Sequence, residues 1–572
     1  MLAFVSMQEP KKFGRQIKTL PSQNPNLNPT QRDPLASSEF ALEQLLFAPA
    51  TPDPDAVRVI YAFPNTYAVG ITSLGYQVIW SLLASRRDVA VSRLFTDLAE
   101  PLPREPELFG FSLSWELDYV HILALLERHG IPPRSEEREE AHPLVFGGGP
   151  VLTANPEPFA EFFDLILLGD GEGLLEKMIE VYREVRQGSR AEKLQALAQV
   201  PGIYVPGLYE PQYREPDGPV EKVLPKVAGI PSSIRKHTFR GNTLSVSTVV
   251  TPKAAWESIY MVEVVRSCPE MCRFCLASYL TLPFRVADVE GHLIPAVERG
   301  LQVTQRIGLL GASVTQHPQF EQLLEHLAQD RFEQVRLSLA SVRTATVTPR
   351  LAQVLSRRGS QSITVAIESG SEQLRQIINK KLSNPEILAA AAHAQAGGLK
   401  GIKFYGMVGI PAETQADLEA TVALFQELKK AAPGLRLTLG CSTFVPKAHT
   451  PFQWHGVDPQ AEKKLQFFQK HLRPLGVELR PESYSWSLIQ ALISRGDRRV
   501  GKVLQLARDF GESLGSYRRA FKELKGQLPP LDYYVHSHWD PGDPLPWQHI
   551  EGPLTPERLL QHRQEALSVR IP

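Results

Sequence analysis

The sequence predicts an α/β protein in three parts: a doubly wound parallel sheet near the N-terminus, a partial (β/α)6 barrel, and a mainly helical C-terminal extension. Two observations predict the first two parts. Short apolar runs alternate with longer amphipathic segments over residues 46–185, and the same alternation recurs over 256–455. Strands joined by helical crossovers run parallel, so each region forms a parallel sheet. A third observation, a group of cysteines after the first strand of the second region, indicates its function.

The N-terminal unit has its β-prone runs at residues 57–63, 89–95, 107–114, 143–150 and 164–173. In a doubly wound sheet, ligands bind beyond the carboxyl ends of the strands. Glycines at such ends either allow close approach of a bulky ligand or only make tight turns. The candidate ligand contacts at these ends are Ser112, Ser114, Gly148, Gly149, Gly169 and Gly171.

The second unit has its expected strands at residues 258–265, 306–311, 335–341, 362–369, 401–411 and 435–445. Helical patterns separate them, including one over 372–381. Repeated βα units of this kind build a partial version of the parallel β/α barrel, whose chemistry lies at the carboxyl ends of the strands. The cysteine group follows the first of these strands and therefore lies on the expected active face.

The remaining segments complete the domain organisation. Residues 1–45, rich in Pro, Asn, Gln and Ser, are expected to form a flexible tail. Residues 186–255 are a mixed connecting segment, and 456–572 form the C-terminal helical and loop extension. In this extension, the basic run at 494–499 is expected to be a solvated face or an intramolecular ion-pair site. His536 and His538 have metal-binding chemistry but lack a third ligand in a suitable pattern.

Composition excludes several classes of function. Lys plus Arg and Asp plus Glu number 62 each in the 572 residues, so the overall charge indicates no nucleic-acid partner. No apolar run approaches the roughly 20 residues that span a bilayer. We therefore expect a cytoplasmic protein, and the few cysteines fit a reducing compartment.

The cysteine group comprises Cys268, Cys272 and Cys275, and only Cys441 lies elsewhere. Structural zinc sites normally take four protein ligands, and no second Cys or His pair follows at the usual spacing. Three thiolates instead suit a cubane iron-sulfur cluster with one open iron. The alternative is that these cysteines are buried as small hydrophobic side chains. For Cys441, packing is favoured over a weak catalytic role.

The spacing Cys-x3-Cys-x2-Cys resembles the signature of the radical S-adenosylmethionine (SAM) superfamily, and Phe274 matches the aromatic position of that motif. The resemblance implies a [4Fe-4S] cluster whose open iron is chelated by the amino and carboxylate groups of SAM. Gly311 and Ala312 stand where the family usually has Gly-Gly-Glu, so backbone groups there would hold the methionine amino group. By resemblance, the carboxylate or ribose contacts are Ser341, Arg343 and Glu368, and the adenine contact is Met407. The alternative for each is a residue that caps a helix or pairs locally.

The N-terminal unit, with Ser-x-Ser after its third strand and Gly-Gly-Gly in its fourth run, resembles the cobalamin-binding domain upstream of many radical SAM modules. By this resemblance, the serines and glycines named above are cobalamin contacts. The family's Asp-x-His-x-x-Gly loop is replaced by residues 64–75, which contain no histidine. Asp118 and His121 have the right letters at the wrong spacing. Cobalamin is therefore expected without a protein histidine ligand.

These resemblances imply a cobalamin-dependent radical SAM enzyme that transfers a methyl group to, or rearranges, a small-molecule or peptide substrate. They also imply an electron donor such as flavodoxin or ferredoxin. Two alternatives remain open: a cluster-only oxidoreductase or cyclase that uses the N-terminal unit for docking, and a non-catalytic iron-sulfur scaffold protein. A methylthiotransferase is disfavoured because no upstream cysteine triad exists to hold a second cluster.

Overall fold

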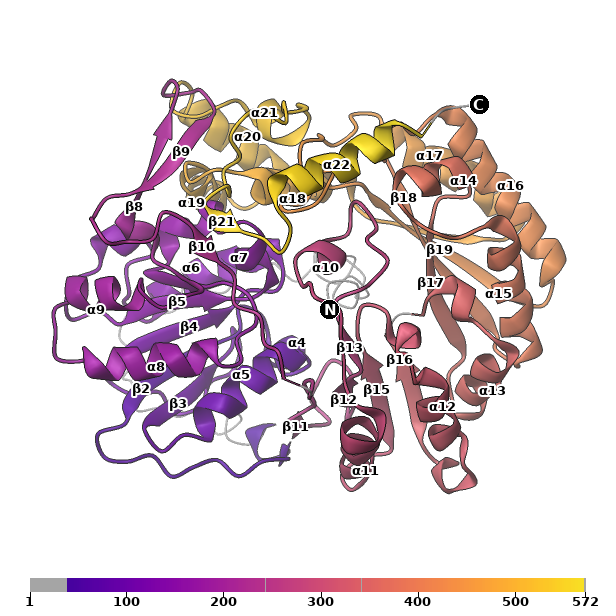
Figure 1. The fold of residues 1–572 in the computed structure, drawn as a ribbon, viewed down its shortest axis with the longest axis horizontal. Helices are drawn as coiled ribbons and strands as arrows, with labels where there is room; N and C mark the ends of the chain where they lie inside the picture. Colours follow the sequence, from indigo (N-terminus) through magenta and orange to yellow (C-terminus); the bar gives the residue numbers. More distant parts are fainter. Residues whose placement is uncertain (1–38, 242, 341, 570–572) are drawn as a thin grey trace.

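A computed structural model describes residues 39–241, 243–340 and 342–569. It confirms the predicted fold class. A sheet with helices on both faces forms one half of the molecule, and a curved sheet with helices outside it forms the other (Figure 1). Most of the expected tail, residues 1–38, lies outside the described residues. The domain boundaries at 45, 185, 255 and 455 stay a prediction.

The N-terminal sheet has the strand order β3-β2-β4-β5-β6-β7, parallel except for β7. All of the strands expected in this unit form. The additional edge strand β7 was not predicted, because two residues carry too little periodicity. The strands are β2 (Val57–Ala62), β3 (Val89–Leu94), β4 (Leu108–Ser112), β5 (Leu144–Gly148), β6 (Leu165–Leu167) and β7 (Ile203–Tyr204). The helices are α4 (Tyr67–Gly70), α5 (Leu74–Ala84), α6 (Tyr119–Arg128), α7 (Pro150–Ala154), α8 (Leu174–Glu184) and α9 (Arg190–Leu197).

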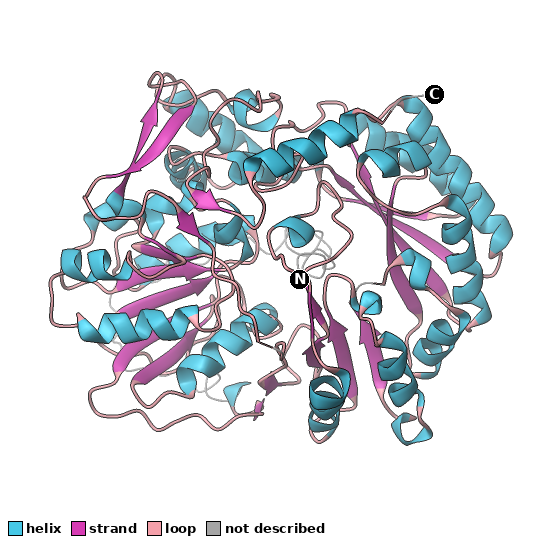
Figure 2. Ribbon diagram, in the orientation of Figure 1, coloured by secondary structure: helices cyan, strands magenta, loops and turns pink. Residues whose placement is uncertain are grey.

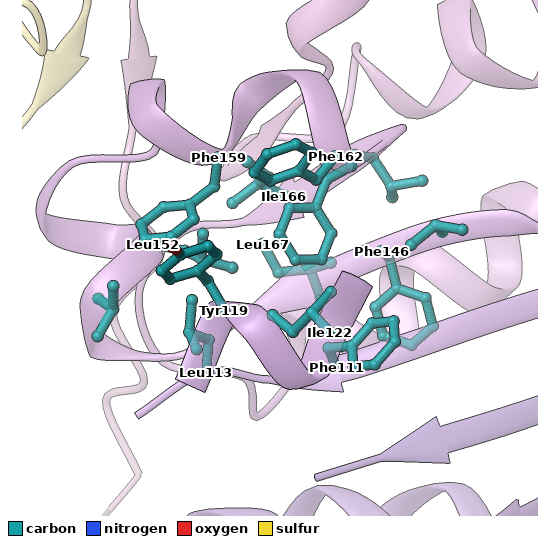
Figure 3. Close-up of a cluster of buried hydrophobic side chains, with 14 of the residues drawn as sticks. Phe111, Leu113, Tyr119, Ile122, Phe146, Leu152, Phe159, Phe162, Ile166 and Leu167 are labelled. Carbon is teal, nitrogen blue, oxygen red and sulfur yellow. The ribbon is translucent and has the colours of Figure 1, made fainter. Parts of the chain in front are cut away.

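The core of this unit is aromatic. Figure 3 shows Tyr119 and Ile122 of α6 in one cluster with Phe111 of β4 and Phe146 of β5. Every residue of β4 is buried, as expected for a parallel strand covered on both faces. Gly110 in this strand has a local reason, since a Cβ there would lie 2.1 Å from the Phe146 ring.

The barrel half contains every expected strand, all parallel to their neighbours. Between β16 and β17 the contact is a single bridge, Val342 to Val365. The strands are β12 (Tyr260–Glu263), β15 (Arg306–Leu310), β16 (Arg336–Leu339), β17 (Ser362–Glu368), β18 (Gly401–Val408), β19 (Arg436–Thr443) and the unpredicted edge strand β20 (Glu478–Pro481). The helices that follow these strands are α11 (Ile294–Leu301), α12 (Phe320–Ala328), α13 (Pro349–Arg357), α14 (Glu372–Ile377), α15 (Asn384–Ala396) and α16 (Gln415–Ala431). Except for α14, they line the outer side of this sheet (Figure 2).

Local sequence sets where several barrel helices begin. Ser383 and Glu386 form a capping box at the start of α15, and Thr414 and Asp417 form one at α16. Thr348 caps α13, which begins with a proline. These residues satisfy backbone N–H groups that a helix leaves unpaired at its first turn.

The C-terminal extension packs back onto the N-terminal sheet. The Tyr119 hydroxyl lies 2.8 Å from the Tyr517 hydroxyl, and the Asn155 amide donates to the Gly496 carbonyl at 2.8 Å. A single apolar core includes residues of both regions. The extension comprises α17 (Ala461–Leu472), α18 (Tyr484–Arg495), α19 (Val500–Asp509), α20 (Leu514–Glu523), α21 (Leu531–Val535) and α22 (Pro556–Leu567).

Short two-stranded pairs connect the parts. β8 (Tyr209–Tyr213) and β9 (Val220–Pro225) form a hairpin. The other pairs are β1 (Gln44–Leu45) with β11 (Val249–Val250), β10 (Ile234–Arg235) with β21 (Ile550–Glu551), and β13 (Val265–Arg266) with β14 (Arg285–Val286). Among the helices of the described ranges, none combines the length and apolar character needed to cross a membrane.

Candidate active site

The cysteine loop, residues 267–275, follows β12 and the short strand β13, and it leads into α10 (Leu276–Tyr279). It lies between the N-terminal sheet and the barrel (Figure 1). Ser267 and Met271 have φ values of 73° and 55°, in the left-handed region that non-glycine residues adopt at a cost. Such conformations persist where surrounding contacts stabilise them. The contacts around this loop therefore determine its backbone conformation.

The three thiols lie close enough to influence one another. Burial, and then the neighbouring Cys275 and Glu368, raise the pKa of Cys272 to about 12, although Lys380 opposes this. Burial also raises the pKa of Cys268. In the absence of metal, the thiols of Cys268 and Cys272 are therefore protonated at neutral pH, and metal binding must release their protons.

The donor set fits the cluster predicted from the sequence. A [4Fe-4S] cluster binds one thiolate at each of three irons, so its cysteines do not converge on a single ion. Within the described ranges, no group of three or more His, Cys, Asp or Glu side chains is placed to hold a single metal ion. The Lys380 ammonium lies near Cys272 and Cys275 and supplies positive charge beside an anionic cluster.

A turn after α14 braces the cysteine loop. The Asn379 amide donates to the Glu270 carbonyl at 3.1 Å and to the Met271 carbonyl at 2.9 Å. Arg273 donates through Nη1 to the Ile377 carbonyl at 2.9 Å. These contacts correct one prediction: the helical pattern over 372–381 ends at Ile377, because the following residues turn to hold the loop.

Arg343 and Glu368 both reach the surroundings of the cysteine loop. Arg343 forms an ion pair with Glu270 at 2.6 Å and donates to the Lys381 carbonyl at 2.7 Å. Glu368, with φ of 64° at the end of β17, pairs with Lys380 at 3.1 Å. Each has a partner within the chain. Ser341 lies outside the described residues.

The expected adenine side is apolar. Met407 of β18 shares a buried cluster with Phe444 and Phe452, and Phe274 packs against it. The structure thus brings together Phe274 and Met407, which are far apart in the sequence. On the other flank, Gly311 has φ of 149°, and a Cβ there would lie 2.7 Å from the Val265 carbonyl oxygen. Ala312 follows it, half-buried.

Other candidates lie apart from this site or serve packing. Cys441 on β19 is buried in the barrel core, beside Gly406 of β18. His536 and His538 do not act as a pair: the Nδ1 atom of His536 hydrogen-bonds to the Val457 carbonyl at 2.8 Å, whereas His538 packs on His455.

The serine and glycine candidates all lie at the carboxyl edge of the N-terminal sheet, at the ends of β4 and β5 and in the loop after β6. A Cβ at Gly149, Gly169 or Gly171 would meet the chain itself within 2.4 Å. Close packing within the chain therefore explains these three glycines, which favours the alternative that they only make tight turns. A Cβ at Gly148 would meet nothing closer than 3.8 Å, so this position alone among the four has an open flank.

Ion pairs join this edge to the cysteine loop. Arg266, immediately before the loop, pairs with Asp170 at 3.2 Å and with Glu172 at 2.8 Å. Arg285 of β14 pairs with Asp170 at 2.6 Å. Against the effect of burial, Arg266 and Arg285 hold the pKa of Asp170 below its usual range. The carboxyl edge of the N-terminal sheet is thus bonded to the strands that carry the cysteines.

Sequence reasoning missed the bracing and linking residues. Glu270 and Arg273 fall inside the cysteine motif, and their position there is the signal that could have found them. Asn379 and Asp170 had no such signal, because their partners lie about a hundred residues away in the chain.

Two family models match the chain. The model described as the radical SAM superfamily matches residues 262–425, and the model for the N-terminal region of radical SAM proteins matches 97–206. The uncharacterized protein MJ0966 of Methanocaldococcus jannaschii is 27% identical over 496 residues, covering 86% of this chain and 98% of that protein. A tRNA-2-methylthio-N(6)-dimethylallyladenosine synthase of Geobacillus thermodenitrificans is 23% identical over 312 residues, covering 51% of this chain and 53% of the synthase.

Solved structures with similar folds include TsrM, a radical SAM methyltransferase of Kitasatospora setae, with cobalamin and a [4Fe-4S] cluster bound. Its TM-score is 0.47 at 13% identity, covering 70% of this chain and 74% of TsrM. The cobalamin-dependent SAM radical enzyme OxsB, with aqua-cobalamin and SAM bound, has a TM-score of 0.45 at 12% identity, covering 89% of this chain and 79% of OxsB.

The radical SAM match begins in β12 and extends through the barrel into α16, so it contains all three cysteines of the loop. That family implies a [4Fe-4S] cluster and SAM as cofactors and a reductant as partner, in agreement with the donor set and the apolar wall beside it. The chain therefore contains a radical SAM domain, preceded by an N-terminal region found in radical SAM proteins, and is a radical SAM enzyme.

Proposed function

We propose that this radical SAM enzyme also uses cobalamin, and that it transfers a methyl group to, or rearranges, an unactivated carbon of its substrate. One observation carries the proposal. The ligand-binding edge of a doubly wound sheet is ion-paired, through Asp170 and Glu172, to Arg266 at the base of the cysteine loop. A cofactor held at that edge would face the cluster site.

In this proposal the chain's own residues position and shield the reactants. Cys268, Cys272 and Cys275 would hold the cluster, and the ion pair of Glu270 with Arg343 offers both charges to the zwitterionic methionine end of SAM. A cluster bound there would supply the electron for reductive cleavage of SAM. Flavodoxin or ferredoxin would provide that electron.

Phe274 and Met407 form the apolar wall on which the adenine would pack. Burial among apolar side chains excludes water, which strengthens the polar contacts at the methionine end.

At the sheet edge, Ser112, Ser114 and Gly148 would contact cobalamin, which carries a methyl group when bound. The Gly148 flank is open, and a hydroxyl group follows the end of β4. The loop after β2 supplies no imidazole, and its Asn65 amide donates to Asp118 at 3.0 Å. Cobalamin would therefore bind without a protein histidine on its lower face.

Anaerobic reconstitution with hydroxocobalamin and methyl-labelled SAM tests this proposal. We expect about four irons per chain, stoichiometric retention of cobalamin, and both 5′-deoxyadenosine and S-adenosylhomocysteine as products. Iron and 5′-deoxyadenosine without retained cobalamin would refute the cobalamin half of the proposal.

A cluster-only oxidoreductase or cyclase is the second candidate, and one observation favours it. Packing against other parts of the chain accounts for Gly149, Gly169 and Gly171, so these glycines give no reason to expect a bulky ligand at the N-terminal sheet. This candidate predicts methionine and 5′-deoxyadenosine as the SAM products, without S-adenosylhomocysteine. A methylthiotransferase remains disfavoured, because Cys441 is the only cysteine outside the loop.

A further inference from the structure

A second group of polar side chains, here called the basic cluster, comprises His455, Arg495, His538 and Arg563. They come from the segment after β19, the end of α18, the segment after α21, and α22. Electrostatic coupling links His455 to each of the other three. The basic cluster lies outside the cysteine loop and has no assigned role in the proposed chemistry.

Arg563 occupies the inward face of α22. Leu559 and Ala566, one turn before and one turn after it on that face, are buried. Among the described residues, the buried Nε atom of Arg563 has no hydrogen-bond partner. None of the described carboxylates lies within 4.0 Å of its guanidinium, and the more distant Asp540 only partly offsets the lowering of the Arg563 pKa by burial. A cation in the apolar stripe of a helix is costly unless something pairs with it.

Arg495 is fully buried. It donates to the carbonyls of Tyr534 at 2.7 Å and Ser537 at 2.9 Å, and it lies 3.8 Å over the Trp539 ring. None of the described carboxylates forms an ion pair with it. Its neighbours in the basic run behave differently: Arg498 pairs with Glu157 at 3.1 Å and Arg499 with Asp497 at 2.6 Å. The expected ion-pair site therefore forms at 498 and 499 but leaves Arg495 uncompensated.

His455 adds an unpartnered polar side chain that is only 6% exposed. Neither of its ring nitrogens has a hydrogen-bond partner among the residues that the structure describes. Its ring lies perpendicular to that of His538, with centroids 5.3 Å apart, and packs edge-on against Phe452 at 5.2 Å. Burial, and then Arg563, His538 and Arg495, lower its pKa to about 3. The neutral ring has one N–H to donate to a ligand.

The basic cluster borders the candidate active site. On α22, His562 hydrogen-bonds through Nδ1 to the Tyr279 hydroxyl at 2.9 Å, and Glu565 pairs with Arg273 at 3.3 Å. Phe452, against which His455 packs, belongs to the apolar cluster of Met407. Arg563 thus lies on a helix that holds the cysteine loop and contributes Ala566 to the apolar cluster of Met407.

We propose that the basic cluster binds an anionic group, a carboxylate or a phosphate, of the substrate, with Arg563 as its main contact. Two cations without carboxylate partners and a buried imidazole without hydrogen bonds together match an anionic ligand. That the anion belongs to the substrate rests on the proposed function, whereas anion binding itself does not. A substrate anchored here would present the rest of its structure to the adenine side of the barrel mouth.

The experiment measures thermal unfolding of the full-length, anaerobically reconstituted chain with inorganic phosphate, succinate or chloride at equal ionic strength. We expect phosphate or succinate to raise the melting temperature of the wild type beyond the effect of chloride, and the stronger of the two identifies the anion class. Arg563→Gln should weaken this binding by about tenfold or more. Arg558→Gln, on the same helix but exposed, should bind like the wild type.

A second readout separates anion binding from a structural role. Without added anion, Arg563→Gln should melt at or above the wild-type temperature, because it removes a cation without a partner; a lower temperature contradicts the proposal. The inference is also overturned if neither anion stabilises the wild type beyond chloride, or if Arg563→Gln retains the full shift.

SAM cleavage, assayed separately, distinguishes this inference from the proposed function. Anion stabilisation without SAM cleavage upholds the anion site and refutes the proposed reaction. SAM cleavage without anion stabilisation overturns the anion site and leaves the proposed reaction standing.

Discussion

Arg266, at the base of the cysteine loop, forms an ion pair with Glu172 of the N-terminal sheet at 2.8 Å. The two residues are 94 positions apart in the chain. Through this pair and the neighbouring Asp170, two α/β units that the sequence presents as separate are held together where both would bind cofactors.

Replacing Arg266 should loosen this connection. Arg266→Gln leaves the carboxylates of Asp170, Glu172 and Glu263 with less compensation, so we expect a loss of about 2 kcal/mol in the free energy of unfolding, between the values for exposed and buried pairs. Chemical denaturation measures this. Arg306→Gln, which breaks the exposed pair with Glu257, is the matched control and should change stability little. Equal effects of the two variants would contradict the account.

The Asn379 side chain should control how firmly the cluster is held. Asn379→Ala removes two hydrogen bonds to the cysteine loop, and loss of such supporting contacts typically lowers metal affinity by roughly 10- to 100-fold. The measurement is the rate of iron loss to a chelator under anaerobic conditions. Lys381→Ala, whose side chain is exposed nearby, should lose iron at the wild-type rate. Equal rates for wild type and Asn379→Ala would show that the loop needs no such brace.

Glu157 should make stability depend on pH in the acid range. Its carboxylate pairs with Arg498 and lies 3.3 Å from His549. Despite the opposing effect of burial, Arg498 and His549 hold the pKa of Glu157 at about 2. Because this pKa is lower than the unfolded value of about 4.3, the carboxylate stabilises the fold above that pH, and the contribution is lost as the pH falls toward about 2.

The test compares melting temperature against pH for wild type and Glu157→Gln. At pH 7 the variant should lose about 3–5 kcal/mol, because Arg498 is left buried without its carboxylate. The difference between the two proteins should shrink between pH 4 and pH 2. A difference that does not change with pH would refute the assignment.

Gly148 should be sensitive to side-chain volume only if cobalamin binds at the sheet edge. Gly148→Leu fills the open flank, so retention of hydroxocobalamin should fall while iron content stays at the wild-type value. Gly207→Leu, also at an open position but outside the sheet edge, should retain cobalamin. Retention of cobalamin by Gly148→Leu would place any such site elsewhere.

Much of the fold could be predicted because its strands are largely apolar runs bounded by helical periods, as in the fully buried β4. The thiol ligands could be predicted because their spacing is local. The turn at Asn379 could not, since a helical pattern continues through it and only a distant contact with Met271 ends the helix. The edge strands β7 and β20 were not predicted, because each is too short to show the alternating pattern of a strand. In the sequence, Arg495 could not be distinguished from the other basic residues of the run, because only its burial in the structure sets it apart.

We expect the cysteine loop to hold a cluster that cleaves SAM. The most direct measurement is iron content together with 5′-deoxyadenosine formation, for anaerobically reconstituted wild type, Cys272→Ala and Cys441→Ala. We expect about four irons and SAM cleavage in the wild type and in Cys441→Ala, and loss of both in Cys272→Ala. Iron and cleavage that survive in Cys272→Ala, or no cleavage in the iron-loaded wild type, would contradict this expectation.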